Sequence, residues 1–575
     1  MLTTLKLFRS VRLSTSDWPA RIFQYPAIGH WLRAIILEAP ADFETAESQW
    51  DLLRGFGAPP PLCTELFTRG RSDAAEKLRR LILDQNDKEL RFDTRYPRHP
   101  KDYISAFVAS LPEQERLEHQ NRILILPSKQ AFKNACALNE SHILVADFDL
   151  NADGGDQLIQ QAKSRHAVIY SGLPGGFPHG NSCELHPPRV HDLKEALVNT
   201  GYTEERARVL TNKSGRDLNL LLRLIQGLSA HPDWATQSQA ADLAIAQLIG
   251  QWKDEKPGDQ QAIEELLGNG YGEWIVRIRQ VASAKAAPLE FAIGRWKFTS
   301  RYEPWIYLGG LIGTDVLDRF KTLAIKVLLE PDPRLQLSKD QRHAASIYGK
   351  ERVYSSCLRE GIAETLALLG SHGKSLTACR GDCGQEVASL VVRELLADAD
   401  SHRWASLNDV LPLLAEAAPD EFLRAVGGAS EKPDEPFSGV FSEEGDMFHG
   451  GSFITGLLWA LESLAWSDQY LLRVSSILAN LAAVDPGGNY SNRPDNSLRG
   501  ILLSWFPQTV ADTDRRHAVV RSISREHPEV GWKLILQLLP QNHSVGHPTH
   551  RPKWQDFIPE DWKDGVPIWP SSASG

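Results

Sequence analysis

Short apolar runs alternate with helical patterns between residues 90 and 170, and this alternation constrains the fold more than any other feature of the chain. The runs that predict strands are Leu90–Phe92, Ile123–Leu126, Ile143–Ala146 and Ala167–Tyr170. Between them, helical spacing of apolar residues occurs at Tyr103–Leu111, Lys129–Leu138 and Asp156–Ser164. Parallel strands need a crossover between them, and strands covered on both faces are short and apolar throughout. The pattern therefore predicts a parallel α/β sheet with helices on both faces.

The rest of the chain divides into regions of different character. Its 575 residues suffice for three or four domains at about 150 residues each. Residues 1–70 predict a helical N-terminal extension, and residues 71–230 hold the α/β module with a small helical lid at its end. In residues 231–305, helices are followed by a hairpin pattern at Phe291–Phe298, which predicts a winged helix. Residues 306–575 predict an all-α array, so the expected fold class is α/β plus all-α.

Within the array, apolar residues recur at helical spacing in nearly every ordered stretch. Stripes at Ile454–Leu464 and Leu471–Val484 are separated only by Ser467-Asp468, which predicts an antiparallel helix pair. We find no strict sequence period, so we expect an irregular helical repeat array in which each helix pair buries its stripe against its neighbours. Two loops rich in Pro, Gly and His, at 428–452 and 541–570, either move freely or pack across the helices.

Charge and composition exclude several classes of protein. Lys and Arg number 63 against 73 Asp and Glu, and this formal net charge of −10 argues against a nucleic-acid binder that works by bulk charge. We find no run of 18 apolar residues and no secretory pattern at the start, so we expect no membrane partner. The six cysteines lie mostly far apart, which fits a reducing compartment. We therefore expect a cytoplasmic protein.

The acidic segment that follows the strand Ile143–Ala146 is the most informative site in the sequence. Asp147, Asp149 and Asp153 come directly after this strand. An apolar strand that ends in acids places carboxylates at the carboxyl edge of a parallel sheet, where ligands bind in open α/β folds. These residues are the candidate metal ligands, and Asp147 and Asp149 are the candidate catalytic residues.

Four interpretations of this segment remain open. Asp147 could be a Walker-B-type acid that holds Mg²⁺ on a nucleotide. Asp149 and Asp153 fall at positions one and five of a calcium loop, although Gln160 stands where a bidentate Glu is needed. Asp147 and Asp149 also resemble the nucleophile and acid/base pair of haloacid-dehalogenase-type phosphotransferases, with Ser171 as a second motif. Finally, the segment could be a strand-to-helix loop with solvated acids.

A phosphate-binding loop should follow the first strand of such a module, and the sequence does not provide one. The segment from Asp93 to Lys101 contains no glycine, and two prolines remove backbone donors from it. A Gly373-Lys374-Ser375 triplet elsewhere follows a helical pattern instead of a strand. The module is therefore P-loop-like but degenerate. Lys101 is the one basic side chain of this segment that we retain as a candidate nucleotide contact.

The order of these features resembles the STAND/AAA-type signalling NTPases, which are large bacterial regulators often linked to phage defence. The residues that carry the resemblance are Gly70-Arg71, Asp147, Ser171-Gly172 and Ser214-Gly215-Arg216, followed by the C-terminal segments Asp485–Gly488, Asn492–Pro494 and Pro548–Pro552. The resemblance covers residues 70–305 as an architecture and 340–560 as local sequence. It implies a chain shortened at its start, because no effector domain is recognisable near Met1.

The resemblance also implies roles for individual residues. By the family's pattern, Asp147 is the Walker-B acid, Arg216 is a lid arginine near the phosphates, and the cofactors are ATP and Mg²⁺. Since the phosphate-binding loop is missing, we expect weak nucleotide binding or none, and no robust ATPase activity. The C-terminal helical array then acts on protein partners.

Other candidate sites are less specific. Cys379 and Cys383 lack the spacing of a zinc site, so an ordinary pair of thiols is favoured. His543, His547 and His550 cluster in a Gly/Pro-rich loop, where a surface loop is favoured over a metal site.

Three hypotheses for function follow. The preferred one is a regulatory or sensor protein related to STAND NTPases that works through protein–protein contacts. The second is a metal-dependent phosphohydrolase that uses Asp147 and Asp149. The third is a helical scaffold whose α/β module has only a structural role.

Overall fold

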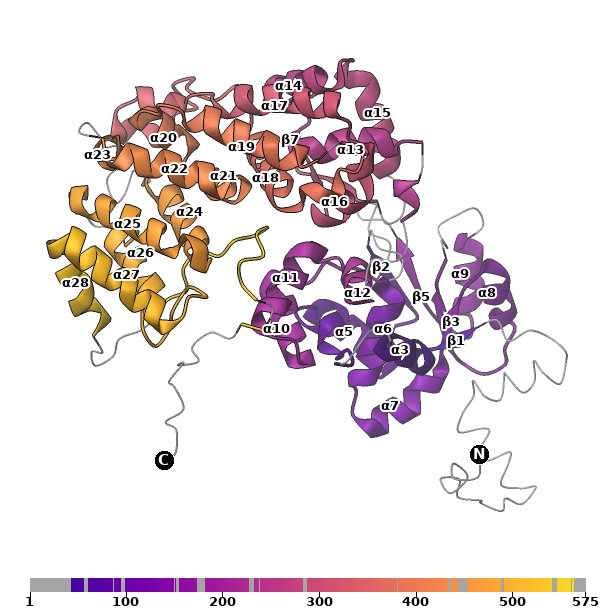
Figure 1. Ribbon diagram of the computed structural model, residues 1–575. Coiled ribbons are helices and arrows are strands. Elements are labelled where there is room, and N and C mark those ends of the chain that lie inside the picture. The colour runs from indigo at the N-terminus through magenta and orange to yellow at the C-terminus, as the bar shows by residue number, and fades with distance from the viewer. Residues whose placement is uncertain are drawn as a thin grey trace, which may run out of the picture. The chain divides into compact units, whose positions relative to one another are not determined.

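The computed structural model forms two compact units (Figure 1). Unit 1 comprises Met1–Tyr202 and Arg216–Ser229, and unit 2 comprises Thr203–Gly215 and Ala230–Gly575. The structure describes residues 43–55, 60–85, 87–94, 99–148, 150, 155–172, 181–226, 232–236, 238–282, 287–379, 381–432, 436–442, 452–487, 491–539, 546–559 and 561–562.

Unit 1 is built on a six-stranded sheet with the strand order β1-β3-β4-β5-β2-β6. The strands are β1 (Glu44–Thr45), β2 (Glu89–Asp93), β3 (Ile123–Leu126), β4 (Ile143–Ala146), β5 (Ala167–Gly172) and β6 (Ser182–Glu184). Strands β2 to β6 pair in parallel, and β1 alone is antiparallel to its neighbour β3. The predicted parallel α/β sheet is confirmed, with β3 and β4 at the expected residues.

Helices cover both faces of this sheet because its strands are apolar on both sides. In β3, Ile123 and Ile125 face one cluster of buried side chains, and Leu124 and Leu126 face the other. Figure 1 shows α3, α5 and α6 on one side of the strands and α8 and α9 on the other. The helices of unit 1 are α3 (Ala46–Gly55), α4 (Glu65–Thr68), α5 (Ser72–Ile82), α6 (His99–Ser110), α7 (Glu113–His119), η2 (Gln120–Arg122), α8 (Lys129–Cys136), α9 (Gly155–Lys163), α10 (Val190–Thr200) and α12 (Leu218–Gln226).

The described part of the expected N-terminal extension belongs to unit 1. Strand β1 pairs with β3, with Glu44 opposite Ile125, and α3 packs against α6. The boundary expected at residue 70 therefore falls inside a compact unit. A strand of two residues leaves no alternation that a sequence pattern could show. The first 42 residues lie outside the described part.

Unit 2 begins with helices and a small antiparallel sheet. The order along the chain is α13 (Ala240–Ile249), β7 (Gln251–Lys253), α14 (Pro257–Leu267), α15 (Tyr271–Ala282), β8 (Leu289–Ala292) and β9 (Arg295–Phe298), and the strand order is β7-β9-β8. The apolar spacing over Ala240–Trp252 predicts one helix. It ends earlier because Gly250 adopts φ 79°, and Trp252 then pairs with Trp296 between strands.

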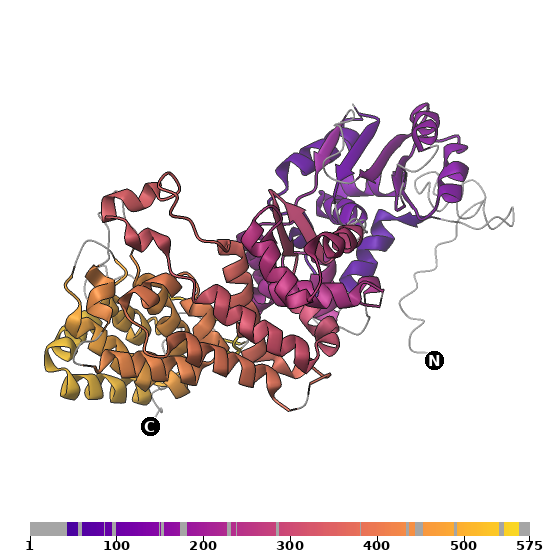
Figure 2. The ribbon, with the colours of Figure 1, turned by 90° about the horizontal axis from the view of Figure 1, so that it is seen from above.

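The remainder of unit 2 is a helical array (Figure 2). Its helices are α11 (Glu204–Ser214), α16 (Tyr302–Leu308), α17 (Thr314–Leu328), α18 (Ser356–His372), α19 (Cys383–Leu396), α20 (Ser401–Leu407), α21 (Leu411–Ala417), α22 (Pro419–Ser430), α23 (Phe437–Ser442), α24 (Thr455–Ala465), α25 (Asp468–Val484), α26 (Pro494–Leu502), α27 (Thr513–Glu526) and α28 (Pro528–Leu538). Short 3-10 turns connect several of them: η3 (Asp233–Ala235), η4 (Gly309–Leu311), η5 (Pro333–Gln336), η6 (Lys339–Ala344) and η7 (Gly373–Ser375). The α/β fold with a following helical array is thus confirmed in outline. Helices α24 and α25 pack against each other as expected.

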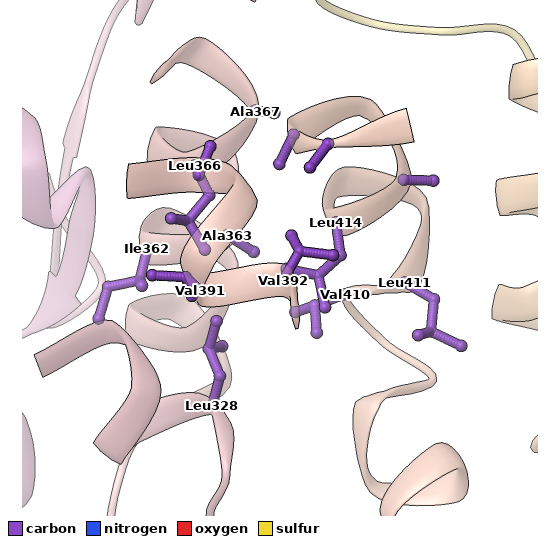
Figure 3. Close-up of a cluster of buried hydrophobic side chains, with 14 of the residues drawn as sticks. Leu328, Ile362, Ala363, Leu366, Ala367, Val391, Val392, Val410, Leu411 and Leu414 are labelled. Carbon is purple, nitrogen blue, oxygen red and sulfur yellow. The ribbon is translucent and has the colours of Figure 1, made fainter. Parts of the chain in front are cut away.

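The core of the array is made where the apolar stripes of neighbouring helices meet. Figure 3 shows Ile362 and Leu366 of α18 together with Val391 of α19 and Leu414 of α21, all of them buried. Helices α18 and α21 approach closely at Gly370, where an added Cβ would lie 2.0 Å from the carbonyl oxygen of Ala417. Only glycine allows this approach, because any side chain there would overlap the neighbouring backbone.

The C-terminal loop packs across the helices. Residues 546–559, which we call the strap, form no helix or strand, yet Trp554 is only 3% exposed. Of the two alternatives for that loop, free movement or packing across the helices, the described part shows packing. Among the residues that the structure describes, no helix is both long and apolar enough to cross a bilayer.

Candidate functional site

The structure brings two of the sequence-predicted residues into direct contact. Lys101 is the third residue of α6, and Asp147 directly follows β4. The Lys101 Nζ atom donates to Asp147 Oδ2 at 2.6 Å, and the two side chains are 11% and 20% exposed. A charge-assisted bond of this length, mostly shielded from water, neutralises the carboxylate.

The backbone explains how these side chains meet. Asp147 is held at the sheet edge by the hydrogen bond from its N–H to the Leu126 carbonyl oxygen. Helix α6 follows β2 on one face of the sheet, and α9 follows β4 on the other face. The chain passes from β2 to β3 and then returns through β4 and β5, so the strand order reverses beside β2, with β5 between β2 and β4. Such a switch point at the carboxyl ends of the strands is where open α/β folds bind ligands.

The first turn of α6 is poorly suited to hold a phosphate. A helix N-terminus attracts anions because its free N–H groups and dipole point at them. Here Pro100 lacks an N–H, and the buried carboxylate of Asp102 already occupies the first turn. Asp102 Oδ1 accepts from Gln49 Nε2 at 2.7 Å. The negative charge that this helix end favours is therefore supplied by the protein itself.

The segment that carries Arg216 reaches the same turn of α6. Asp217 Oδ1 lies 3.3 Å from Nε2 of His99, the first residue of α6. The His99 ring is buried, and burial lowers its pKa although the neighbouring Asp217 opposes this shift. Arg216 is half-buried with φ 70°, directly before Asp217. The structure thus places the lid segment of unit 1 at the helix end that also presents Lys101.

One local expectation for this segment is wrong. The sequence Ser214-Gly215-Arg216-Asp217 matches the capping-box pattern, which predicts that Ser214 caps the helix that follows. Ser214 instead ends α11, and Gly215 and Arg216 both adopt positive φ. Asp217 caps α12, since its Oδ1 atom accepts from the N–H of Asn219 at 2.8 Å. Two consecutive left-handed residues separate the helices, a conformation that the capping pattern does not reveal.

A second ion pair lies at the end of β2. Arg91 Nε is 2.7 Å from Asp93 Oδ1, and the Arg91 side chain is 9% exposed. This guanidinium lies over Gly172 of β5, where an added Cβ would come within 2.3 Å of Arg91 Nε. The glycine of the Ser171-Gly172 motif therefore makes room for an arginine. Ser171 itself lies in β5 opposite Phe92.

These residues do not fit a magnesium–nucleotide site in the part of the chain that the structure describes. A Walker-B acid must offer a free carboxylate oxygen to the cation or its water. The Asp147 carboxylate instead binds the ammonium group of Lys101. Asp149 and Asp153 lie outside the described residues, and among the described residues no group of three or more His, Cys, Asp or Glu side chains forms a metal site.

Those other candidates that the structure describes also show no catalytic arrangement, and His543 lies outside the described residues. All six cysteines are free, and burial together with the hydrogen bond to Cys379 raises the pKa of the Cys383 thiol to about 11. His550 stacks on Trp459 with a ring separation of 5.3 Å, and burial lowers its pKa. The Gly373–Ser375 triplet forms a 3-10 turn after α18, so no strand precedes it.

Sequence reasoning did not identify which residues contact the predicted site residues. It singled out Lys101 and Asp147 separately, as nucleotide and metal contacts, and did not pair them. A lysine early in the helix that follows the first strand, combined with an acid at a later strand end, is the signal that could have shown the pair. His99 and Asp217 carried no comparable signal.

Comparison of the chain with family models, with curated proteins and with solved structures gives no match.

Proposed function

We propose that this chain is a regulatory or sensor protein, related to the bacterial STAND-type regulators that act in phage defence, in which the α/β unit has lost nucleotide turnover. The observation that carries this proposal is the 2.6 Å contact between Lys101 Nζ and Asp147 Oδ2. The ammonium group lies where a nucleotide-dependent switch would need a divalent cation. Unit 1 then serves as a structural switch module, and the protein acts by contact with protein partners.

The arrangement of unit 1 supports a nucleotide-switch ancestry. Asp147, Lys101 and the Arg216-Asp217 segment come from three separated parts of the chain, and all lie at the carboxyl edge of the parallel sheet. This is the edge where ligands bind in open α/β folds. A module built only for stability has no need to bring a lid segment to that edge.

The first part of unit 2 supports a winged helix that contacts protein. Three helices are followed by a hairpin whose strands pair in the order β7-β9-β8. A nucleic-acid-binding helix would direct its arginines toward phosphates. On α15, Arg277 instead pairs with Asp242 and Arg279 pairs with Asp254, each at 2.7 Å. The charge on this face of the helix is therefore compensated within the unit.

A turnover assay tests the proposal. Purified chain is incubated with ATP or with p-nitrophenyl phosphate in the presence of Mg²⁺, and released phosphate or nitrophenol is measured. We expect the wild type to release no more product than the matched Asp147→Asn variant. Turnover by the wild type that Asp147→Asn abolishes would contradict the proposal and favour a phosphohydrolase that uses Asp147 and Asp149.

A control variant distinguishes a nucleotide site that Lys101 blocks from a site that has lost its phosphate-binding loop. In Lys101→Met the ammonium is removed while the bulk of the side chain is largely kept. If the α/β unit only lacks a free carboxylate, this variant should gain Mg²⁺-dependent nucleotide binding. If the phosphate-binding loop is lost as well, as the sequence from Asp93 to Lys101 predicts, the variant should remain inactive and bind ATP no better than the wild type.

A further inference from the structure

The strap is bound along its length by side chains of unit 2, although it has no secondary structure of its own. Successive backbone N–H and carbonyl groups of the strap form hydrogen bonds with side chains of the helices. The N–H of His550 donates to Glu462 Oε2 at 2.8 Å, and the carbonyl oxygen of His550 accepts from Trp466 Nε1 at 3.1 Å. The carbonyl oxygen of Pro552 accepts from Arg208 Nη1 at 2.8 Å. The site therefore binds the main chain of a segment that has no regular secondary structure and bends at Lys553 and Trp554.

The densest contact is made by one buried glutamate. Glu416 is 1% exposed, and its carboxylate accepts the N–H groups of three consecutive strap residues, Lys553, Trp554 and Gln555, at 2.9, 2.6 and 3.0 Å. The Gln555 side chain returns a hydrogen bond to the Glu416 carbonyl oxygen at 2.7 Å. Within the described part of the chain, the strap provides all the hydrogen-bond donors to this carboxylate.

Two further buried glutamates hold the basic side chains of the strap. Arg551 Nη1 lies 3.2 Å from Glu205 Oε2, and its guanidinium lies 4.7 Å from the centre of the Trp466 ring. Lys553 Nζ lies 2.5 Å from Glu364 Oε1. We call Glu205, Glu364, Glu416 and Glu462 the glutamate row. Each comes from a different helix, in the order α11, α18, α21 and α24.

Among the described residues, Glu416 has no donor to its carboxylate other than the strap, whereas Glu205 also pairs with Arg208, Glu364 with Arg301 and Glu462 with Ser497. A buried carboxylate without donors is strongly destabilised, whereas one with several N–H partners or a cation is not. When the strap leaves, Glu416 loses three backbone donors and Glu364 loses the ammonium of Lys553. The vacated site would therefore favour another bent segment that presents consecutive main-chain N–H groups to Glu416 and carries two spaced cations.

We propose that the glutamate row is a peptide-binding site that a partner protein occupies with a basic segment bent like the strap, in place of the strap. The strap is the site's internal ligand, and its sequence Arg551-Pro552-Lys553-Trp554 describes the partner segment: a cation, a residue that needs no N–H, a second cation and a tryptophan. The inference rests on the proposed role of the array in partner binding and names the chemistry of that partner.

Helix α11 contacts the strap and directly precedes the lid segment in the sequence. Helix α11 contributes both Glu205 and Arg208 to the strap site. It ends at Ser214, and Asp217, which contacts His99, follows within three residues. Displacement of the strap removes Arg551 and the Pro552 carbonyl oxygen from α11.

Peptide binding to the full chain tests the proposal. The probe is a fluorescent, isotopically labelled peptide with the sequence of residues 546–559, and the control peptide has alanine at the Arg551, Lys553 and Trp554 positions. The strap is weakened in the full chain by Lys553→Ala together with Trp554→Ala. We expect this variant to bind the probe at least tenfold more tightly than the wild type does, and at least tenfold more tightly than it binds the control peptide. Adding Glu364→Gln should lower that affinity at least fivefold.

A second measurement covers the case in which the weakened variant fails to fold. In the wild type, hydrogen–deuterium exchange of the strap is followed with and without excess probe, whose label separates its mass from that of the chain. We expect the chain's own amides at residues 553–555 to exchange at least tenfold faster when the probe is present. Unchanged exchange at saturating probe would overturn the proposal.

Other results would also overturn it. Equal binding of the probe and the alanine peptide would show that the site does not read the basic and aromatic side chains. Dimers of the weakened variant that exclude the probe would show that the site serves a second copy of the chain. Neither result depends on nucleotide. The proposed loss of turnover in unit 1 is therefore tested separately, by the phosphate-release assay.

Discussion

Both units contain carboxylates that are shielded from water and paired within the protein, but the partner groups differ between the two units. In unit 1 the acid at the sheet edge, Asp147, is satisfied by one side chain, Lys101. In unit 2 a whole segment of the chain binds the glutamate row, and Glu416 alone accepts three of its backbone N–H groups. In each unit, therefore, the position that a ligand would take is filled by the protein.

The difference between the two sites concerns reversibility. A lysine side chain is anchored in a helix and leaves a carboxylate only by rotating into solvent or by mutation. A segment without secondary structure can be exchanged for another segment that offers the same backbone groups. We therefore regard the edge of unit 1 as a closed site and the strap site as one that a competitor can open.

The largest effect should follow from disturbing the helices that carry the glutamate row. Gly370→Ala places a Cβ 2.0 Å from the Ala417 carbonyl oxygen, so α18 and α21 must move apart. We expect a loss of about 3 kcal/mol in the stability of unit 2, as for overpacked cores. Thermal unfolding measures it. Gly428→Ala is the matched control, because nothing lies within 4 Å of that position, and helix propensity should stabilise it by up to about 1 kcal/mol.

Removing the charge of Glu416 should affect the strap next most strongly. Glu416→Gln keeps the size of the side chain but replaces an acceptor oxygen by a donor that faces backbone N–H groups. Hydrogen bonds to charged groups contribute about 1.5–3 kcal/mol, so amide exchange at residues 553–555 should accelerate roughly 10- to 150-fold. Hydrogen–deuterium exchange checks this. The exposed Glu394→Gln should leave these rates unchanged, and an equal acceleration there would refute the assignment.

A double-mutant cycle on Lys101 and Asp147 sharpens the comparison in unit 1. The pair is mostly buried, so Lys101→Met should destabilise unit 1 more in the presence of Asp147 than in Asp147→Asn, with a coupling of about 1–2 kcal/mol. Urea unfolding read by exchange in unit 1 measures it. The exposed pair Glu76–Arg80, whose side chains are 65% and 57% exposed, is the control and should show about 0.5 kcal/mol or less.

The smallest effect is a pH dependence of unit 1. Burial lowers the pKa of His99, so the folded state binds its proton less readily than the unfolded chain, whose histidines titrate near pH 6.5. The contribution of His99 to stability is therefore present above about pH 6.5 and is lost as the pH falls toward the lowered folded-state pKa. The loss should be at most about 1.4 kcal/mol for each pH unit below about pH 6.5.

Variants at two histidines isolate this effect. His99→Gln should flatten the pH dependence of unit 1 stability, measured by urea unfolding at several pH values. His191→Gln should leave it unchanged, because that ring is 84% exposed. A His99→Gln slope equal to that of the wild type would show that other groups control the acid sensitivity.

The parts of the fold that depend on local apolar patterns could be predicted from the sequence. Strands β3 and β4 are apolar over four consecutive residues and lie where expected. The two-residue β1 has no such pattern, and only its pairing with β3 defines it. Trp252 was assigned to a helix because its apolar neighbours continue the helical spacing, whereas the positive φ of Gly250 ends the helix first.

The candidate site was predictable as a set of residues but not as a set of contacts. The acid after β4 and the basic residue after β2 follow from the rule that strand ends meet at one edge of a sheet. Their direct pairing depends on the orientation of α6, which no local pattern fixes. The glutamate row was harder to predict than the Lys101–Asp147 pair. Glu416 stands among alanines and leucines in α21, and its three backbone donors lie more than 130 residues further along the chain.

Isothermal titration of the full chain with ATP and Mg²⁺ tests the central claim most directly, because it asks whether the edge of unit 1 is open to a ligand. The account predicts no binding heat at micromolar or submillimolar ATP, either for the wild type or for Asp147→Asn. Micromolar binding that requires Mg²⁺ and disappears in Asp147→Asn would show that Lys101 yields its place to the cation, and would contradict the account.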